Sequence, residues 1–119
     1  MRNLVNSVKD QTVLITGASG LLGRATCKKL IDLGIKVFGL VRKVPDNPID
    51  SVSYIQGDLT HGDLVELLPA HVDSILHLAQ SDRFRDFPDG AVDVLMVNTM
   101  STVLLLDYAL RASATTFIY

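Results

Sequence analysis

The 119-residue sequence has few of the features that mark specialised classes of protein. It contains a single cysteine, Cys27, so no internal disulfide can form and a disulfide-stapled secreted scaffold is excluded. The longest uninterrupted aliphatic run is Val103 to Leu106, whereas a membrane-spanning helix needs roughly 20 apolar residues, so we expect no membrane segment. The amino-terminal residues carry no apolar signal-peptide core, which makes the cytoplasm the default location.

The net charge is low, and the basic residues are not clustered. The formal net charge is −2, and the Lys and Arg residues are scattered rather than gathered into a basic stripe, which does not favour nucleic-acid binding. With 48% hydrophobic and 20% charged residues, the composition is that of a globular rather than a disordered chain. There is no internal repeat, low-complexity tract or linker, so we expect one domain over residues 1–119.

Short β-type runs alternate with helical stretches along the chain. Strands are predicted over residues 12–16, 36–41, 52–56, 73–78 and 115–119, and helices over residues 21–33, 60–68 and 88–111. Thr60 is the expected N-cap of the short helix. The long helix carries an apolar stripe formed by Val92, Leu95, Met96, Thr99, Val103, Leu106 and Leu110. Such alternation with short connections requires crossovers, which predicts a parallel sheet with helices on both faces.

The strongest local signal is the sequence TGASGLLG at residues 16–23, which follows a predicted strand and opens a predicted helix. Gly17 permits a tight turn out of the strand, Gly20 lets the backbone approach a pyrophosphate, and Gly23 allows the helix to pack closely on the strand. The free N–H groups at the helix N-terminus would then face the anion. The alternative is a plain strand–turn–helix made of small residues.

This glycine pattern resembles the TGxxGxxG signature of the extended short-chain dehydrogenase/reductase family, also called the NAD-dependent epimerase/dehydratase family. Further motifs of the sequence are similar to elements of that family: GDL at residues 57–59, HLA at residues 77–79, and Asn98 with the small and apolar residues that follow it. Gln80 and Ser101 depart from the family pattern, since a small residue and a glycine are usual there. The resemblance implies a Rossmann-type doubly wound α/β fold, here about five parallel strands in the order 3-2-1-4-5.

The same resemblance implies which residues would hold a dinucleotide cofactor. The pyrophosphate would lie at the glycine-rich turn, the adenosine at Arg42 and the GDL motif, and the walls would come from the HLA motif, with Asn98 behind them. The implied cofactor-binding residues are Gly17, Ser19, Gly20, Leu21, Leu22, Gly23, Arg42, Asp58, Leu59, Leu78, Ala79 and Asn98. No metal ligand is implied.

The end of the second predicted strand bears on the choice between NAD and NADP. A carboxylate there hydrogen-bonds the ribose hydroxyls, whereas an Arg pairs with a 2′-phosphate. The sequence has Val41 at the place where NAD-dependent members of the family carry Asp, followed by Arg42 and Lys43. By resemblance this favours NADP over NAD. The alternative is that the two cations simply begin an exposed loop.

Other residue types that could carry chemistry have ordinary interpretations. We expect His77 to be a packing residue, His61 and His71 to be surface histidines rather than zinc ligands, and Cys27 to be a small buried thiol. The charged segment 82–89 is either a solvated loop with local charge pairs or a loop that shapes the substrate entrance. Tyr119 is assigned no catalytic role.

By resemblance, the family's catalysis uses a Ser or Thr, a Tyr and a Lys that would follow residue 119. The sequence ends inside an apolar β-run, so we expect the front part of a longer oxidoreductase or epimerase/dehydratase acting on a sugar nucleotide or another small hydroxyl or carbonyl substrate. We expect these residues alone to turn nothing over, and a homodimer is a further expectation. One alternative is a non-catalytic NADP-binding redox sensor or regulatory module. Another is that the fragment binds nothing and associates through an exposed sheet edge.

Overall fold

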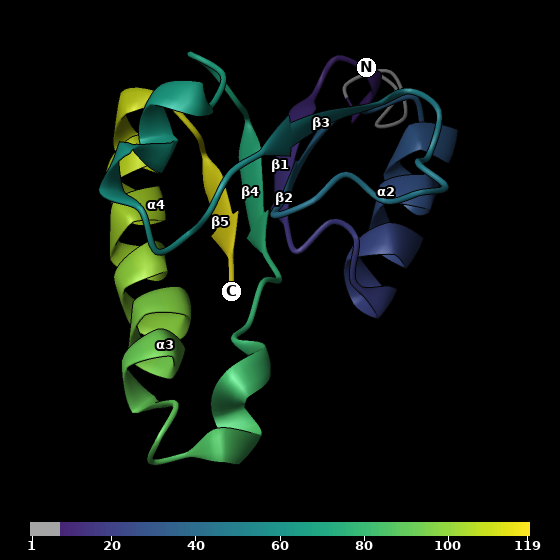
Figure 1. Cartoon of the computed structure of the whole chain (residues 1–119). Helices are drawn as coiled ribbons and strands as arrows, with labels where there is room; N and C mark the ends of the chain where they lie inside the picture. The colour runs from purple at the N-terminus through teal and green to yellow at the C-terminus, as the bar shows by residue number, and fades with distance from the viewer. Residues whose placement is uncertain (1–7) are drawn as a thin grey trace.

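The computed structural model describes residues 8–119, in which strands and helices alternate along the chain (Figure 1). Residues 1–7, which include most of the segment where we expect no signal sequence, lie outside the described residues. The strands are β1 (Thr12–Thr16), β2 (Lys36–Val41), β3 (Val52–Gln56), β4 (Ser74–His77) and β5 (Thr116–Ile118). The helical elements are α2 (Leu21–Asp32), η1 (Gly62–Leu67), η2 (Asp82–Asp86), α3 (Ala91–Leu95), η3 (Met96–Met100) and α4 (Ser101–Arg111).

The strands form one five-stranded parallel sheet in the order β3-β2-β1-β4-β5, which confirms the predicted fold class and strand order. The central strand β1 pairs with β2 on one side and with β4 on the other, so that Thr16 is aligned with both Leu40 and His77. Because the strands are parallel, the loops that follow them meet at one edge of the sheet. The chain order reverses between β1 and β4, and ligands of open α/β sheets bind at such a reversal.

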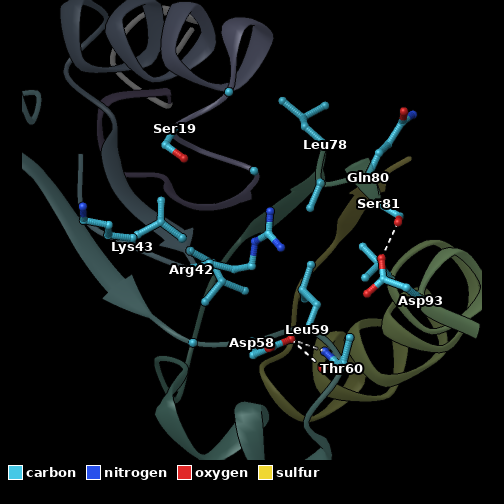
Figure 2. A pocket seen from close by; sticks show the side chains of 17 residues that line it. Ser19, Arg42, Lys43, Asp58, Leu59, Thr60, Leu78, Gln80, Ser81 and Asp93 are labelled. Atoms are coloured by element: carbon cyan, nitrogen blue, oxygen red, sulfur yellow. Dashed lines mark hydrogen bonds between the residues drawn. The ribbon is translucent and has the colours of Figure 1, made fainter. Parts of the chain in front are cut away.

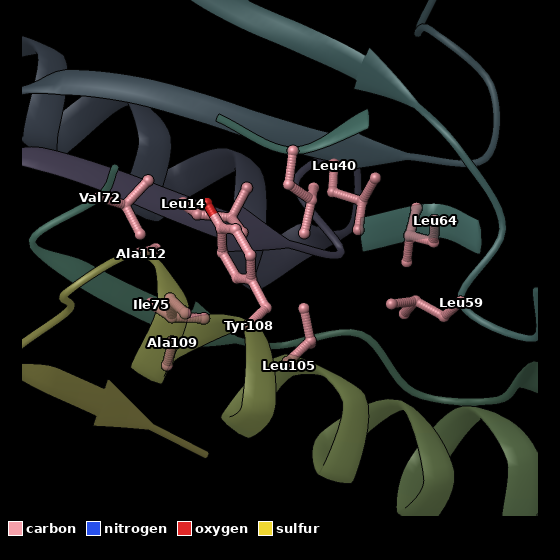
Figure 3. Packing of buried hydrophobic residues seen from close by; sticks show 11 residues of the cluster. Leu14, Leu40, Leu59, Leu64, Val72, Ile75, Leu105, Tyr108, Ala109 and Ala112 are labelled. Carbon is pink, nitrogen blue, oxygen red and sulfur yellow. The ribbon is translucent and has the colours of Figure 1, made fainter. Parts of the chain in front are cut away.

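Two hydrophobic cores lie on opposite faces of the sheet, because successive side chains of a strand point to opposite sides. In β1, Val13 and Ile15 join the core beneath α2, and Leu14 joins the core shared with α4 and η1. Figure 1 shows α2 on one side of the sheet and α3 with α4 on the other. The residues of the α4 side, including Tyr108, are drawn in Figure 3. The central strand is therefore covered on both faces, as a doubly wound fold requires.

The long helix begins three residues later than predicted and is not uniform. It runs from Ala91 to Arg111 and consists of α3, one π-helical turn (η3) and α4. Residues 82–86, ahead of it, form the short 3₁₀ helix η2. The short helix expected over residues 60–68 is likewise a 3₁₀ helix, η1.

The apolar stripe of the long helix does not face the sheet. Leu105, Tyr108 and Ala109 are buried against the core, whereas Val92 and Leu110 of the stripe are 76% and 83% exposed. Helical spacing alone could not separate these two faces, because both are apolar at a period of three to four residues. The outward stripe is thus a surface feature of the described chain.

The 21-residue helix Ala91–Arg111 is also long and apolar overall, although the sequence has no long uninterrupted apolar run. By length and composition it could cross a membrane. Because its inner face packs on the sheet through residues such as Leu105, we assign the helix to the α/β fold.

Candidate functional site

A cavity of about 440 Å³ lies at the edge of the sheet where the strand ends meet (Figure 2). It is lined by the end of β2, by residues from the loops that follow β1, β2, β3 and β4, and by two residues of the long helix. The lining residues are Gly17, Ser19, Gly20, Leu40, Val41, Arg42, Lys43, Gly57, Asp58, Leu59, Thr60, Leu78, Ala79, Gln80, Ser81, Asp93 and Val97. Its position coincides with the reversal of strand order between β1 and β4.

Most of the residues implied by the sequence resemblance line this cavity. Four of them do not: Leu21, Leu22, Gly23 and Asn98. Leu21 and Leu22 are 96% and 64% exposed, and Leu21 borders a separate shallow hollow on the outer side of α2. Asn98 lies behind the cavity wall, where its side-chain oxygen accepts a hydrogen bond from the Ser81 N–H at 2.8 Å.

The glycine-rich turn brings two backbones into close contact. Gly17 has φ +66°, and a Cβ atom placed on it would lie 2.8 Å from the Ala79 nitrogen, so a side chain would meet the end of β4. A Cβ atom on Gly23 would overlap the Gly17 carbonyl oxygen. These positions therefore require glycine for the tight turn and for the close packing of α2 on it.

The amino-terminal end of α2 is left open to an anion. Gly20 is its N-cap, makes no side-chain capping bond, and no acidic residue stands in the first turn. The first N–H groups of a helix have no partner within the helix and carry the positive end of its dipole. With Gly17, Ser19 and Gly20 all lining the cavity, this end can hold a phosphate group.

On the next wall, Asp58 is held as a carboxylate. Its Oδ1 atom accepts hydrogen bonds from the Thr60 N–H at 2.8 Å and from the Thr60 hydroxyl at 2.6 Å. The side-chain and backbone bonds from Thr60 lower the pKa of Asp58, and the charges of His61 and Arg42 act in the same direction. The prediction that Thr60 caps the short helix is wrong, because His61 is the N-cap of η1 and the Thr60 hydroxyl is engaged with Asp58.

Arg42 and Lys43 follow β2 and line the cavity, so the cations expected from the sequence do lie at this site. In Figure 2 the Arg42 side chain reaches into the middle of the cavity. Its Nη2 atom lies 3.5 Å from Oδ2 of Asp82, and both side chains are about 70% exposed (70% and 71%). The cavity thus presents an exposed cation whose charge acts on the carboxylate of Asp58 on the neighbouring loop.

Beneath the cavity floor, His77 links three elements through a directional chain of hydrogen bonds. The Ala79 N–H donates to the Thr16 hydroxyl at 3.1 Å, and that hydroxyl lies 2.6 Å from Nδ1 of His77. Nε2 of His77 lies 3.0 Å from the hydroxyl of Ser101, which donates to the Val97 carbonyl oxygen. Since each hydroxyl has one proton to give, the neutral imidazole carries its proton on Nε2.

This arrangement explains the departure at Ser101 and the role of His77. The Ser101 hydroxyl, at a position where the family usually has glycine, accepts the hydrogen bond from Nε2–H of His77. His77 is 3% exposed, does not line the cavity, and burial lowers its pKa, which keeps it neutral. The expectation that His77 packs in the strand rather than exchanging protons at the site agrees with this placement, although its contacts are polar as well as apolar.

Sequence reasoning missed Ser81 and Asp93, which line the far wall. The Ser81 hydroxyl caps η2 by accepting from the Arg83 N–H at 3.1 Å, and it donates to Oδ2 of Asp93 (Figure 2). The signal for the cap was present, because Ser before Asp82 at the start of a short charged segment is a typical N-cap. The bond to Asp93 joins residues of two elements and has no local signature.

The remaining histidines and the cysteine do not line the cavity. His61 and His71 are exposed, and His71 contacts the Ala112 carbonyl oxygen at 2.7 Å. Cys27 lies on the buried face of α2, as predicted, and this burial raises the pKa of its thiol. Among residues 8–119, no group of three or more metal-binding side chains comes together.

Comparison with known proteins agrees with this geometry. The model of the NAD dependent epimerase/dehydratase family matches residues 13–119. The chain is 25% identical to a dTDP-glucose 4,6-dehydratase of Streptomyces antibioticus (90% of this chain, 36% of the relative). It is 35% identical to a probable NADP-dependent dehydrogenase of Haemophilus influenzae (88% of this chain, 38% of the relative). It spans little more than a third of either curated relative.

A solved structure of a family relative has the same fold. A short-chain dehydrogenase/reductase superfamily protein from Agrobacterium tumefaciens, crystallised with bound NAD, superposes with a TM-score of 0.75 at 27% identity. The match covers 89% of this chain and 31% of that chain.

Proposed function

Because this chain belongs to the NAD-dependent epimerase/dehydratase family, we propose that it forms the dinucleotide-binding part of an NAD(P)-dependent oxidoreductase or epimerase/dehydratase. One observation carries the proposal. The glycine turn after β1 and the uncapped amino-terminal end of α2 open onto a 440 Å³ cavity at the point where the strand order reverses. A phosphate-bearing ligand satisfies the orphan N–H groups there.

The chain's own residues contribute binding and orientation. Backbone N–H groups near Gly20 hold the pyrophosphate, and the ionised Asp58 with its neighbour Leu59 receives the adenosine. Leu78 and Ala79 form the opposite wall, fixed by the Thr16–His77 hydrogen bond beneath them. A bound nicotinamide supplies the hydride chemistry, and the protein supplies its position and exclusion of water.

We propose a preference for NADP over NAD. No carboxylate stands at the end of β2, and the cations Arg42 and Lys43 both line the cavity. An Arg there can pair bidentately with a phosphate that NAD lacks. The relative from Haemophilus influenzae, named as NADP-dependent, makes the same preference reasonable in this chain.

The reaction is proposed for the whole protein, since the chain spans little more than a third of either of these two curated relatives. A sugar nucleotide is one substrate class, because one relative is named a dTDP-glucose dehydratase, and other small hydroxyl or carbonyl compounds remain within the proposal. None of the described residues is assigned a catalytic role. A non-catalytic NADP sensor is the second candidate, and the presence of a later Tyr-x-x-x-Lys would separate the two.

We also propose a homodimer, formed through the outward stripe of the long helix. Exposed apolar residues recur along that face at helical spacing, including Val103 and Leu106 at 54% and 46% exposure. Extended exposed apolar patches mark protein–protein contacts, and this stripe supports such a contact.

Calorimetric titration with NADPH and NADH tests the cofactor proposal. Gly20→Ala should abolish or strongly weaken binding of both dinucleotides, because a methyl group would stand where the backbone must approach the phosphate. The fold should tolerate this change, since Gly20 has φ −72° and its Cβ would meet only the Gly17 carbonyl oxygen, at 3.3 Å. Gly62→Ala is the matched control, because nothing lies within 4 Å of that position. Unchanged affinity in Gly20→Ala, or no binding by the unmodified chain, would contradict the proposal.

A further inference from the structure

The contact between Arg42 and Asp82 spans the site from one side to the other. Arg42 follows β2 and Asp82 begins η2 after β4, so the two residues stand on either side of the central strand β1. Their side chains meet at 3.5 Å, although 40 residues separate them in the sequence. The cation expected to receive a phosphate therefore already has an anionic neighbour.

The backbone that carries Asp82 is fixed by the residue before it. The Ser81 N–H donates to Asn98 at 2.8 Å, and the Ser81 hydroxyl donates to Asp93 while accepting from the Arg83 N–H. These bonds tie the start of η2 to the long helix. The carboxylate of Asp82, which contacts the cavity-lining residue Arg42, is thus carried by an anchored turn.

A second acidic residue of the same turn lies in a different environment. Asp86 is paired within the turn, with its Oδ2 atom 3.5 Å from Nε of Arg83. A Cβ atom on Gly90 would lie 2.8 Å from the Arg83 carbonyl oxygen, so the end of the turn packs closely on the start of the long helix. The turn therefore contains one carboxylate directed to Arg42 and one that is satisfied locally.

We propose that Asp82 is a specificity-determining residue for the dinucleotide, acting through Arg42. Its carboxylate competes with the 2′-phosphate of NADP for the same guanidinium and repels that phosphate. With NAD, which has no phosphate at this place, Arg42 keeps Asp82 as its partner. Asp82 thereby narrows the preference for NADP that Arg42 and Lys43 would otherwise give. This inference rests on the proposed dinucleotide function.

The expected size of the effect follows from the exposure of the pair. Ion pairs between exposed side chains are weak and screened by salt. Removing the Asp82 carboxylate should therefore raise the dissociation constant of NADH relative to that of NADPH about two- to five-fold. The change should be smaller at high ionic strength. A larger change is not expected, because both side chains are about 70% exposed.

The test is calorimetric titration of the full chain and its variants with NADPH and NADH. Asp82→Asn should raise affinity for NADPH while changing affinity for NADH little, and the matched variant Asp86→Asn should leave the ratio unchanged. When Arg42 is already replaced by Ala, Asp82→Asn should change the ratio of the NADH to the NADPH dissociation constant only slightly. Thermal unfolding of each variant checks that the fold is intact.

The outcomes separate the inference from the function on which it rests. An unchanged ratio in Asp82→Asn, an equal change in Asp86→Asn, or a full effect without Arg42 would overturn the role of Asp82 while leaving dinucleotide binding in place. Unaltered NADPH affinity in Arg42→Ala would overturn the NADP preference and the role of Asp82 together. Failure of the unmodified chain to bind either dinucleotide would overturn the proposed function itself.

Discussion

Replacing Ser101 by Ala should cost stability out of proportion to the single hydroxyl removed. Ser101 is 1% exposed, and its oxygen is the acceptor for Nε2–H of His77, which is itself buried. Without that oxygen the ring N–H has no partner in the core, and a buried donor left unsatisfied costs about 1–3 kcal/mol. The better helix propensity of Ala returns up to about 0.5 kcal/mol. The net loss should be about 0.5–2.5 kcal/mol.

Urea unfolding at neutral pH measures this loss. With a denaturant dependence of about 1–3 kcal/mol/M for a small domain, a loss near 1.5 kcal/mol should lower the midpoint by roughly 0.5–1.5 M without changing the slope. Thr102→Ala is the matched control, because the Thr102 hydroxyl also donates to a helix carbonyl, that of Asn98 at 3.1 Å, but receives no buried side chain. The control should shift stability by less than about 0.5 kcal/mol. Equal midpoints for the two variants would refute the reasoning that the His77 contact is what matters.

Two further predictions concern the same part of the molecule. Burial lowers the pKa of His77, so below about pH 6.5 the unfolded chain binds a proton at this residue and the folded chain does not. The free energy of unfolding should therefore fall as the pH drops from about 6.5 toward the lowered pKa. His77→Gln should flatten this dependence in urea titrations at several pH values. If the pH slope in that range is the same in both proteins, the buried imidazole is not its source. Leu110→Glu should convert a dimer into a monomer in light scattering without loss of stability, because Leu110 is 83% exposed, whereas Lys29→Glu on α2 should not. A mass that does not change in Leu110→Glu would place the interface elsewhere or exclude it.

The architecture was predictable because its signals are local. Alternating strands and helices with short connections predict a parallel sheet with helices on both faces, and the family resemblance supplied the strand order 3-2-1-4-5. The turn at Gly17 and the close packing at Gly23 follow from steric needs that the sequence displays within eight residues. The structure places most of the implied cofactor residues around one cavity for the same reason, since they follow the ends of adjacent parallel strands.

What could not be predicted depends on contacts between distant segments. The long helix is apolar on two faces, and only the position of the sheet decides that Leu105 points inward and Val103 outward. Thr60 has the residue type of an N-cap, but the competing acceptor Asp58 takes its hydroxyl and its N–H. The approach of Asp82 to Arg42 joins positions 40 residues apart, and no periodicity in either segment indicates it.

The two walls of the cavity differ in the free energy needed to open them. The glycine turn follows β1, a strand whose residues Leu14 and Ile15 are fully buried. The amides of β1 lie between the paired strands β2 and β4. Such amides exchange with solvent only when the whole domain unfolds. The short helix η2 follows the lining residue Ser81 and has no buried residue, so it can open at a lower free-energy cost, which includes breaking the Ser81 bonds to Asn98 and Asp93. Hydrogen exchange should therefore be slow for the amides of β1 on one side of the cavity and fast for the amides of η2 on the other side. A dinucleotide would bind against the slowly exchanging side, and opening of the rapidly exchanging side would set its association and dissociation rates.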